Sequence, residues 1–221
     1  MEALAVLMIL LKDGLNSMLE KDYAFLFPTK VCGFKNPDSD ELNHDICEYL
    51  LSQRESDPDR DKFSIKGGWH SAMNLADLEF DWSKKLKNLI IEASSLYFPC
   101  LIPEDSPIEC WGVILEKGNV STYHTHPGTD LSGVYYVKAS EELLKTKSGS
   151  IVIPDTRAGA CGTLHTEPSW CHSPSTGMGL VFPAWVPHFV EPHFLEESRI
   201  SISWNILLPL EFKSGSLALN N

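Results

Sequence analysis

Two histidines, His124 and His126, stand two residues apart shortly before an apolar run at residues 134–137. Residues i and i+2 of a β-strand project from the same face, so this spacing aims both imidazoles at one point. Imidazole nitrogen is a common ligand of transition metals. The pair therefore predicts two of the three protein ligands of a facial metal site.

A third candidate ligand is His188, which follows an apolar strand and a turn within residues 182–190. In a jelly roll, strands that are distant in the sequence become neighbours, so the separation is no obstacle. Two histidines and a third protein ligand leave coordination positions open, as in non-haem Fe(II) oxygenases. Asp130, beyond a Pro-Gly turn, is the alternative to His126 as the second ligand, and we favour His126.

Arginine and serine alternate with apolar residues a little further along the chain. The polar positions are Arg199, Ser201 and Ser203, and the apolar positions are Ile200, Ile202 and Trp204. An arginine that faces the interior needs a partner, because an unpaired buried charge costs several kcal/mol. A carboxylate held by Arg199, with the Ser201 hydroxyl as a second donor, would meet that need.

The segments that must position these residues are short β-rich runs separated by Gly, Pro, Asn and Asp. We expect strands at residues 109–115, 120–126, 133–139, 149–153, 178–182, 189–191 and 200–208. Many short strands between turn residues favour a sandwich or barrel. Apolar residues at helical spacing predict helices over 41–54 and from Asp81 to about 97. The prediction is a mainly β, α+β fold in which an N-terminal helical layer packs on a C-terminal β-structure.

Composition limits the function further. The chain has 221 residues and a formal net charge of -12, which argues against nucleic-acid binding. Six cysteines without a Cys-x-x-Cys pair indicate reduced thiols and predict a cytoplasmic protein. The apolar run at residues 3–11 is too short to span a membrane. We expect residues 1–24 to form a helical extension that contacts the core or a partner, such as a second copy in a homodimer; a cleaved signal peptide is the less favoured alternative.

Three motifs carry a resemblance to a known family. They are His-x-His-Pro followed by Leu-Ser-Gly-Val-Tyr-Tyr-Val at 124–137, Phe-Pro-x-Trp-x-x-His-x-Val-x-Pro at 182–192, and Arg-Ile-Ser-Ile-x-x-Asn at 199–205. Together they resemble the 2-oxoglutarate/Fe(II)-dependent oxygenases related to prolyl 4-hydroxylases, over roughly residues 25–210. The resemblance implies a double-stranded β-helix (jelly roll, cupin-like). It also implies one oxygenase domain over 25–221, with a helical layer at 25–107 and the β-helix at 108–212.

The resemblance also implies roles for individual residues. His124, His126 and His188 would bind Fe(II), although the wider superfamily has a carboxylate at the position of His126. Arg199 and Ser201 would bind the distal carboxylate of 2-oxoglutarate. Tyr135 is either a further cosubstrate contact or a residue that fills the barrel. Candidate pocket residues, each with a structural role as the alternative, are Ser132, Asn205 and Trp185.

The implied reaction consumes 2-oxoglutarate and O2, releases succinate and CO2, and hydroxylates an amino-acid, peptidyl (for example prolyl) or small-metabolite substrate. No catalytic residue is expected beyond the metal centre. Two alternatives remain: a three-histidine iron dioxygenase that does not use 2-oxoglutarate, and a non-catalytic cupin-like binding module.

Two further groups of residues have uncertain roles at this level. His70, within Gly-Gly-Trp-His-Ser at 67–71, either borders the site or packs within the fold, and we favour packing. The segment 157–177 is predicted to be a lid or substrate loop. A zinc site is the less favoured alternative there, with the residues Cys161, His165, Cys171 and His172.

Overall fold

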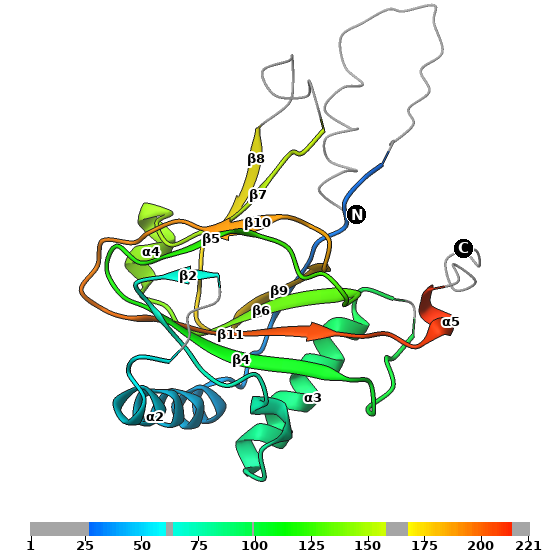
Figure 1. Cartoon of the computed structure of the whole chain (residues 1–221), viewed down its shortest axis with the longest axis horizontal. Helices are drawn as coiled ribbons and strands as arrows, with labels where there is room; N and C mark the ends of the chain where they lie inside the picture. The colour runs from blue at the N-terminus through cyan, green and yellow to red at the C-terminus, as the bar shows by residue number, and fades with distance from the viewer. Residues whose placement is uncertain (1–26, 61–63, 99, 158–167, 214–221) are drawn as a thin grey trace, which may run out of the picture.

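The computed structural model describes residues 27–60, 64–98, 100–157 and 168–213, and it consists mainly of two antiparallel β-sheets (Figure 1). The predicted helical extension at 1–24 lies outside the described residues. None of the helices within those residues is long and apolar enough to cross a membrane.

The larger sheet has six strands in the order β1-β9-β6-β11-β4-β3. Its strands are β1 (Cys32–Lys35), β3 (Trp69–His70), β4 (Ile108–Leu115), β6 (Leu131–Lys138), β9 (Met178–Pro183) and β11 (Arg199–Ile206). The smaller sheet has the order β2-β5-β10-β7-β8. Its strands are β2 (Ile65–Lys66), β5 (Val120–His124), β7 (Ile151–Pro154), β8 (Ser169–His172) and β10 (His188–Val190). Neighbours in each sheet come from distant parts of the chain, as in a jelly roll, so the predicted fold class is confirmed.

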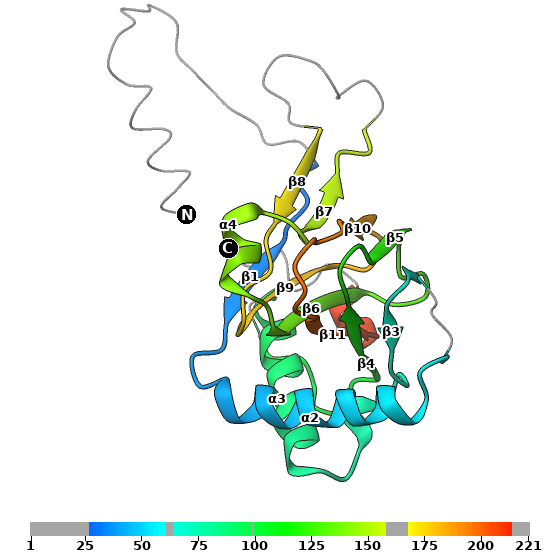
Figure 2. The same ribbon diagram turned by 90° about the vertical axis from the view of Figure 1, so that its left-hand side faces the viewer.

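Two long helices, α2 (Asp40–Ser56) and α3 (Asp81–Ser95), cover the outer face of the six-stranded sheet (Figures 1 and 2). In α2 the buried positions Leu42, Ile46 and Leu50 are four residues apart, so they form one apolar stripe. This stripe packs on the sheet, and the opposite face of each helix remains in water.

The core between the helices and the sheet depends on Trp204 of β11. Its indole Nε1 donates a hydrogen bond to Ser94 Oγ of α3 at 3.1 Å. The ring lies where a Cβ on Gly133 would stand, 2.1 Å from the Trp204 Cζ2 atom. Glycine at this point of β6 therefore lets the largest core side chain lie across the neighbouring strand.

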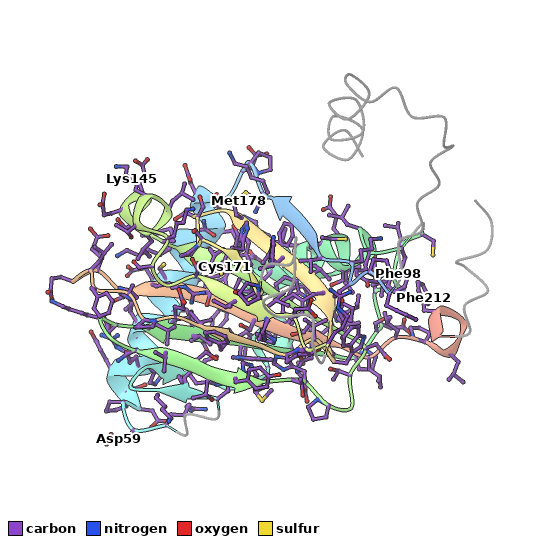
Figure 3. All side chains as sticks on the ribbon, turned by 90° about the horizontal axis from the view of Figure 1, so that it is seen from above. Asp59, Phe98, Lys145, Cys171, Met178 and Phe212 are labelled. Atoms are coloured by element: carbon purple, nitrogen blue, oxygen red, sulfur yellow. The ribbon has the colours of Figure 1, made fainter. Side chains whose placement is uncertain are left out.

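The remaining helical elements are short: the 3₁₀ turn η1 (Leu75–Asp77), α4 (Glu141–Thr146) and α5 (Leu210–Lys213). The Phe212 ring of α5 packs edge-on against Phe98, with ring centroids 5.2 Å apart (Figure 3). This contact fixes the chain that follows β11 against the segment after α3.

The expected strands and helices are present with shifted ends, and several short elements were not predicted: β2, β3, η1, α4, β8 and α5. Of these, β8 lies within the segment 157–177 that was predicted as a loop. β8 is an edge strand of Ser, Trp, Cys and His with no alternation of apolar and polar residues, so the sequence gives no strand pattern there.

Candidate functional site

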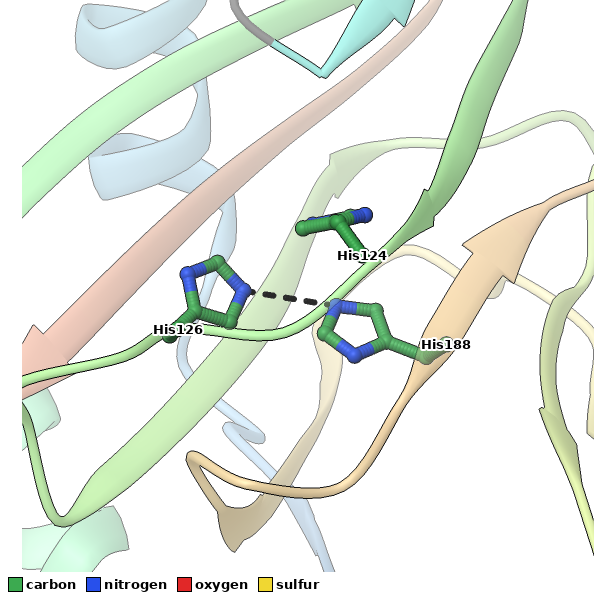
Figure 4. A group of neighbouring side chains, drawn as sticks. All are labelled: His124, His126 and His188. Atoms are coloured by element: carbon green, nitrogen blue, oxygen red, sulfur yellow. Dashed lines mark hydrogen bonds between the residues drawn. The ribbon is translucent and has the colours of Figure 1, made fainter. Parts of the chain in front are cut away.

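Three imidazoles converge where β5 and β10 run side by side (Figure 4). His124 is the last residue of β5, His188 is the first residue of β10, and the two are paired directly across the ladder. His126 follows in the loop after β5. One nitrogen from each ring can be chosen so that all three lie within 4.8 Å of one another. Among the described residues, this is the group that could hold a metal ion.

The backbone that brings His124 and His126 together differs from the one expected. β5 ends at His124, so His126 is not on a continuous strand, and the prediction of a strand over 120–126 is wrong at its end. The backbone N–H of His126 instead donates to Ala184 O at 2.9 Å, which ties the loop to the end of β9. The turn that breaks the strand contains Gly128 at φ +87.

A register shift helps to turn His124 inward. His188 pairs with His124 and Val190 pairs with Ser121, so between these pairs two residues of β5 oppose one residue of β10. Such an irregularity reverses the side-chain alternation locally. Ser121 and His124, an odd number of residues apart, consequently both line the same cavity.

Backbone carbonyls orient two of the rings. His124 Nδ1 lies 2.6 Å from Thr122 O, and His188 Nδ1 lies 3.0 Å from Val186 O. A carbonyl oxygen only accepts, so each Nδ1 carries the proton and donates it, which leaves Nε2 free to bind a metal. His126 Nε2 lies 3.4 Å from His188 Nε2, the contact drawn as a dashed line in Figure 4.

Burial keeps the three imidazoles neutral. It lowers the pKa of His124, and it lowers the pKa of His126 to about 3, an effect that His188 and His124 increase. Burial and the neighbouring His124 lower the pKa of His188 to about 4 against the opposing hydrogen bond to Val186. Metal binding requires neutral imidazole, so this set of donors fits a metal ion at neutral pH.

A buried guanidinium belongs to the same cavity. Arg199, the first residue of β11, is only 2% exposed, and its Nη1 donates to Ser201 Oγ at 3.2 Å. Its Cζ lies 5.0 Å from the centroid of the Tyr136 ring, a cation–π contact. Burial lowers the pKa of the Arg199 guanidinium, but arginine stays charged in proteins.

The polar groups around Arg199 lack partners. Arg199 Nε and the Tyr136 hydroxyl are buried and make no hydrogen bond within the described part of the chain. No carboxylate there pairs with Arg199. Since unpaired buried donors are costly, the arrangement fits a carboxylate-bearing ligand.

One cavity joins the imidazoles to the guanidinium. Its lining includes His124, His126, His188, Arg199, Ser201, Ser132, Ser203, Trp111, Ile65 and Phe182. None of the described residues that line this cavity is acidic. A metal ion and an anion can therefore share the space between the two sheets.

Adjacent tyrosines on β6 face opposite ways. Tyr135 lies on the helix side of the sheet, where its hydroxyl donates to Asn43 Oδ1 at 2.8 Å and its ring stacks on Phe34. The structure therefore does not bring Tyr135 to the site, and its role is structural, in the core between the sheet and the helices rather than inside the barrel. Tyr136 packs beneath Arg199 instead, and the sequence analysis did not identify it.

Of the other predicted pocket residues, some line the cavity and others do not. Ser132 lines the cavity and donates to Trp204 O at 3.1 Å. Asn205 lies outside the lining, and its Nδ2 donates to Glu109 Oε2 at 3.1 Å. Trp185 is 63% exposed and borders a different surface groove. The Asp130 carboxylate accepts from Leu208 N at 2.8 Å and is not part of the imidazole group, so the structure favours His126 over Asp130.

The residues of the zinc alternative do not form a described site. Cys171 and His172 lie on β8 and join no group that could hold a metal within the described residues. Cys161 and His165 lie outside them. His70 is buried, does not line the cavity and stacks on Trp111, with ring centroids 5.6 Å apart, which agrees with the packing role.

Comparisons with known proteins agree with this site. Residues 109–205 match the model of a family described as "Putative 2OG-Fe(II) oxygenase". The matched stretch contains all three histidines and Arg199, and it lies within the predicted β-helix at 108–212. A search of curated proteins gives no match.

Solved structures share the fold at low identity. A prolyl-4-hydroxylase from Pseudomonas putida has a TM-score of 0.58 and 14% identity, covering 82% of this chain and 94% of that one. A Trichoplax adhaerens prolyl hydroxylase, in complex with a hypoxia inducible factor peptide fragment, has a TM-score of 0.56 and 15% identity, covering 86% and 87%. HygX from Streptomyces hygroscopicus, with nickel and 2-oxoglutarate bound, has a TM-score of 0.53 and 12% identity, covering 81% and 83%. These solved structures show that the fold is shared, and the family match shows that residues 109–205 are similar to 2OG-Fe(II) oxygenases.

Proposed function

We propose that this protein, whose residues 109–205 match the 2OG-Fe(II) oxygenase family, is a dioxygenase with a three-imidazole metal centre. Bound Fe(II) and 2-oxoglutarate would supply the oxidative chemistry, in which substrate, 2-oxoglutarate and O2 give hydroxylated substrate, succinate and CO2. The observation that carries the proposal is the single cavity that holds both a three-imidazole group and an unpaired buried guanidinium.

The imidazoles would hold Fe(II) through their Nε2 atoms. The backbone hydrogen bonds at His124 and His188 support this, because they assign the proton to Nδ1 and fix each ring. His126 would complete the facial set with a third neutral donor in place of a carboxylate.

The opposite end of the cavity would bind the distal carboxylate of 2-oxoglutarate. Arg199 offers an unpaired Nε, and the Tyr136 hydroxyl beside it is also without a partner among the described residues. Ser201, already within 3.2 Å of Arg199 Nη1, would turn its hydroxyl to the same anion. The apolar side chains of Phe182 and Ile65 would keep water away from both groups.

The proposed substrate is an amino acid, a peptidyl residue such as proline, or a small metabolite. Support for a peptide comes from the two prolyl hydroxylases of similar fold, one of which is in complex with a peptide.

We also propose that residues 25–221 form one domain, since α2 and α3 share a continuous core with the six-stranded sheet. The five described cysteines are free thiols, which supports a reducing compartment such as the cytoplasm. A homodimer remains part of the proposal, and nucleic acid is not an expected partner.

Anaerobic spectroscopy tests the proposed function. Fe(II) and 2-oxoglutarate are added to the full chain without O2, and the visible charge-transfer band of the chelate is recorded. The proposal expects this band in the wild type and its loss in His188→Ala. Fe(II) binding without a band would favour the three-histidine dioxygenase that does not use 2-oxoglutarate, and no Fe(II) binding would favour a non-catalytic binding module.

A further inference from the structure

His126 differs from the other two imidazoles in how it is held. The Nδ1 atoms of His124 and His188 each contact a backbone carbonyl, at 2.6 Å and 3.0 Å. The only contact made by the His126 ring nitrogens to the described residues is the one from Nε2 to His188 Nε2 at 3.4 Å. His126 also lies beyond the end of β5, outside the ladder that fixes the backbone of His124.

An aromatic ring lies beside His126. Trp111 of β4 is 6% exposed, and its ring centroid lies 5.9 Å from that of His126 at an angle of 41°. Trp111 also stacks nearly parallel on the buried His70, at 5.6 Å and 16°. His70, Trp111 and His126 therefore form a row of ring contacts (the stack), parallel at His70 and tilted at His126, that leads from β3 to the metal-binding group.

Residues 67–71 hold the start of this stack in place. β3 pairs with β4 so that His70 stands opposite Val113. Ser71 makes two further bonds to the residue after Trp111: its N–H donates to Gly112 O at 2.9 Å, and its Oγ accepts from Gly112 N at 2.8 Å. These bonds fix the backbone at the residue that follows Trp111.

We propose that Trp111, fixed by His70 and Ser71, is a positioning residue that orients the His126 ring toward the metal. This inference rests on the proposed function, because it needs the three imidazoles to be metal ligands. The stack takes the place of the backbone hydrogen bond that orients the other two rings. It gives the Gly-Gly-Trp-His-Ser segment a role in the site although His70 does not line the cavity.

The inference predicts an unequal response to the loss of ring contacts. Without Trp111, the His126 ring is free to rotate, and the ion loses a preorganised donor. Loss of an orienting partner typically lowers metal affinity about 10- to 100-fold. Trp82 of α3 offers a matched comparison, because it is also a buried tryptophan, but its ring packs on Tyr49 at a centroid distance of 5.0 Å and it does not line the cavity.

The experiment measures Co(II) affinity and the visible Co(II) spectrum of the full chain. Trp111→Leu is expected to weaken Co(II) binding about 10- to 100-fold, with Trp111→Phe retaining most of the affinity. Trp82→Leu is expected to change it by less than about 3-fold, because the Trp82 ring packs on Tyr49 of α2 and on Phe80 and is not part of the cavity. Thermal unfolding of each variant ensures that affinity is compared between folded proteins.

A double-mutant cycle separates positioning from general packing. If Trp111 acts through His126, then Trp111→Leu added to His126→Ala causes no further loss of Co(II) affinity. Equal losses in the wild-type and His126→Ala backgrounds would overturn the inference and leave the proposed metal centre intact. An unchanged affinity in Trp111→Leu would do the same. Absence of Co(II) binding by the wild type would overturn both.

Discussion

The two faces of the six-stranded sheet carry side chains with different roles, although both faces are built from the same strands. On β11, Ile200, Ile202 and Trp204 point toward the helices, while Arg199 and Ser201 point into the cavity. On β6, Tyr135 joins the core and Tyr136 lies beneath the guanidinium. The period of two along a strand thus builds the core and the candidate site from one stretch of backbone.

The two faces also differ in what they contribute to stability. The outer face is apolar and tightly packed, and each fully buried Ile or Leu stabilises the fold by about 1.5 to 3 kcal/mol. The inner face keeps the Nε of a charged guanidinium and a tyrosine hydroxyl without hydrogen bonds to the described residues, which weakens the ligand-free protein. Stability therefore resides mainly on one side of the sheet and ligand affinity on the other.

The largest expected effect is the loss of metal binding on the cavity side. His188→Ala removes a donor and should lower Fe(II) affinity by more than about 100-fold, because even the loss of an outer partner costs 10- to 100-fold. Ile202→Val on the outer face should cost about 0.5 to 1.5 kcal/mol of stability and leave Fe(II) affinity unchanged. Anaerobic Fe(II) titration and urea unfolding measure the two quantities, and a similar loss of Fe(II) affinity in both variants would contradict the division.

Arg199→Met is the next sharpest test. Removing the charge should cost about 2 to 5 kcal/mol of 2-oxoglutarate affinity, the usual loss for a buried ion pair. The ligand-free protein should be equally stable or more stable, because an apolar side chain of similar volume replaces an unpaired buried charge. Calorimetric titration and thermal unfolding check both halves. If the variant binds 2-oxoglutarate with normal affinity, Arg199 does not bind this ligand and the assignment is wrong.

The paired tyrosines give a smaller but cleaner contrast. Tyr136→Phe should cost about 1.5 to 3 kcal/mol of 2-oxoglutarate affinity, as expected for a hydrogen bond to a charged group. Tyr135→Phe should leave that affinity unchanged and cost about 1 to 3 kcal/mol of stability, because the buried Asn43 Oδ1 loses its donor. Reversal of the two phenotypes would show that the strand faces have been assigned the wrong way round.

The last contrast is a pH dependence confined to the cavity side. The folded pKa of His126 is about 3 and that of His188 about 4, both below the ordinary value of 6.5. As pH falls below 6.5, the unfolded chain takes up protons first, so the metal-free protein should lose stability from about pH 6.5 toward pH 3 and show no such change above 6.5. Urea unfolding of the metal-free protein measures this, and His126→Asn should reduce the decline. If the stability of that variant declines equally steeply with falling pH, other titrating groups cause the decline.

Part of this division could be predicted from the sequence. On β11 an arginine and two serines alternate with isoleucines, so the inner and outer faces are distinguishable by residue type. On β6 the run Val-Tyr-Tyr-Val is apolar at every position, and nothing in its composition says which tyrosine faces inward. The sequence therefore leaves Tyr135 with two alternative roles, a cosubstrate contact or a barrel-filling residue, and it does not identify Tyr136, which is the residue beside Arg199.

The geometry of the histidines shows a second limit of the sequence. The spacing suggested that His124 and His126 converge, and they do. However, the convergence comes from a register shift in β5 and from a loop whose backbone is hydrogen-bonded to Ala184. Both depend on pairing with residues about sixty positions away, which a local pattern does not encode. Trp111 is a similar case, because its contact with His126 arises only once β4 packs across the cavity.

The central claim is that the imidazoles and Arg199 serve one ligand in one cavity, and thermodynamic coupling tests it most directly. The affinity of the full chain for 2-oxoglutarate is measured anaerobically with and without Fe(II). A ligand that spans both ends should bind at least about 10-fold more tightly when Fe(II) is present, and Fe(II) should bind more tightly by the same factor when 2-oxoglutarate is present. His188→Ala should abolish this coupling. Equal 2-oxoglutarate affinity with and without Fe(II) in the wild type would contradict the account.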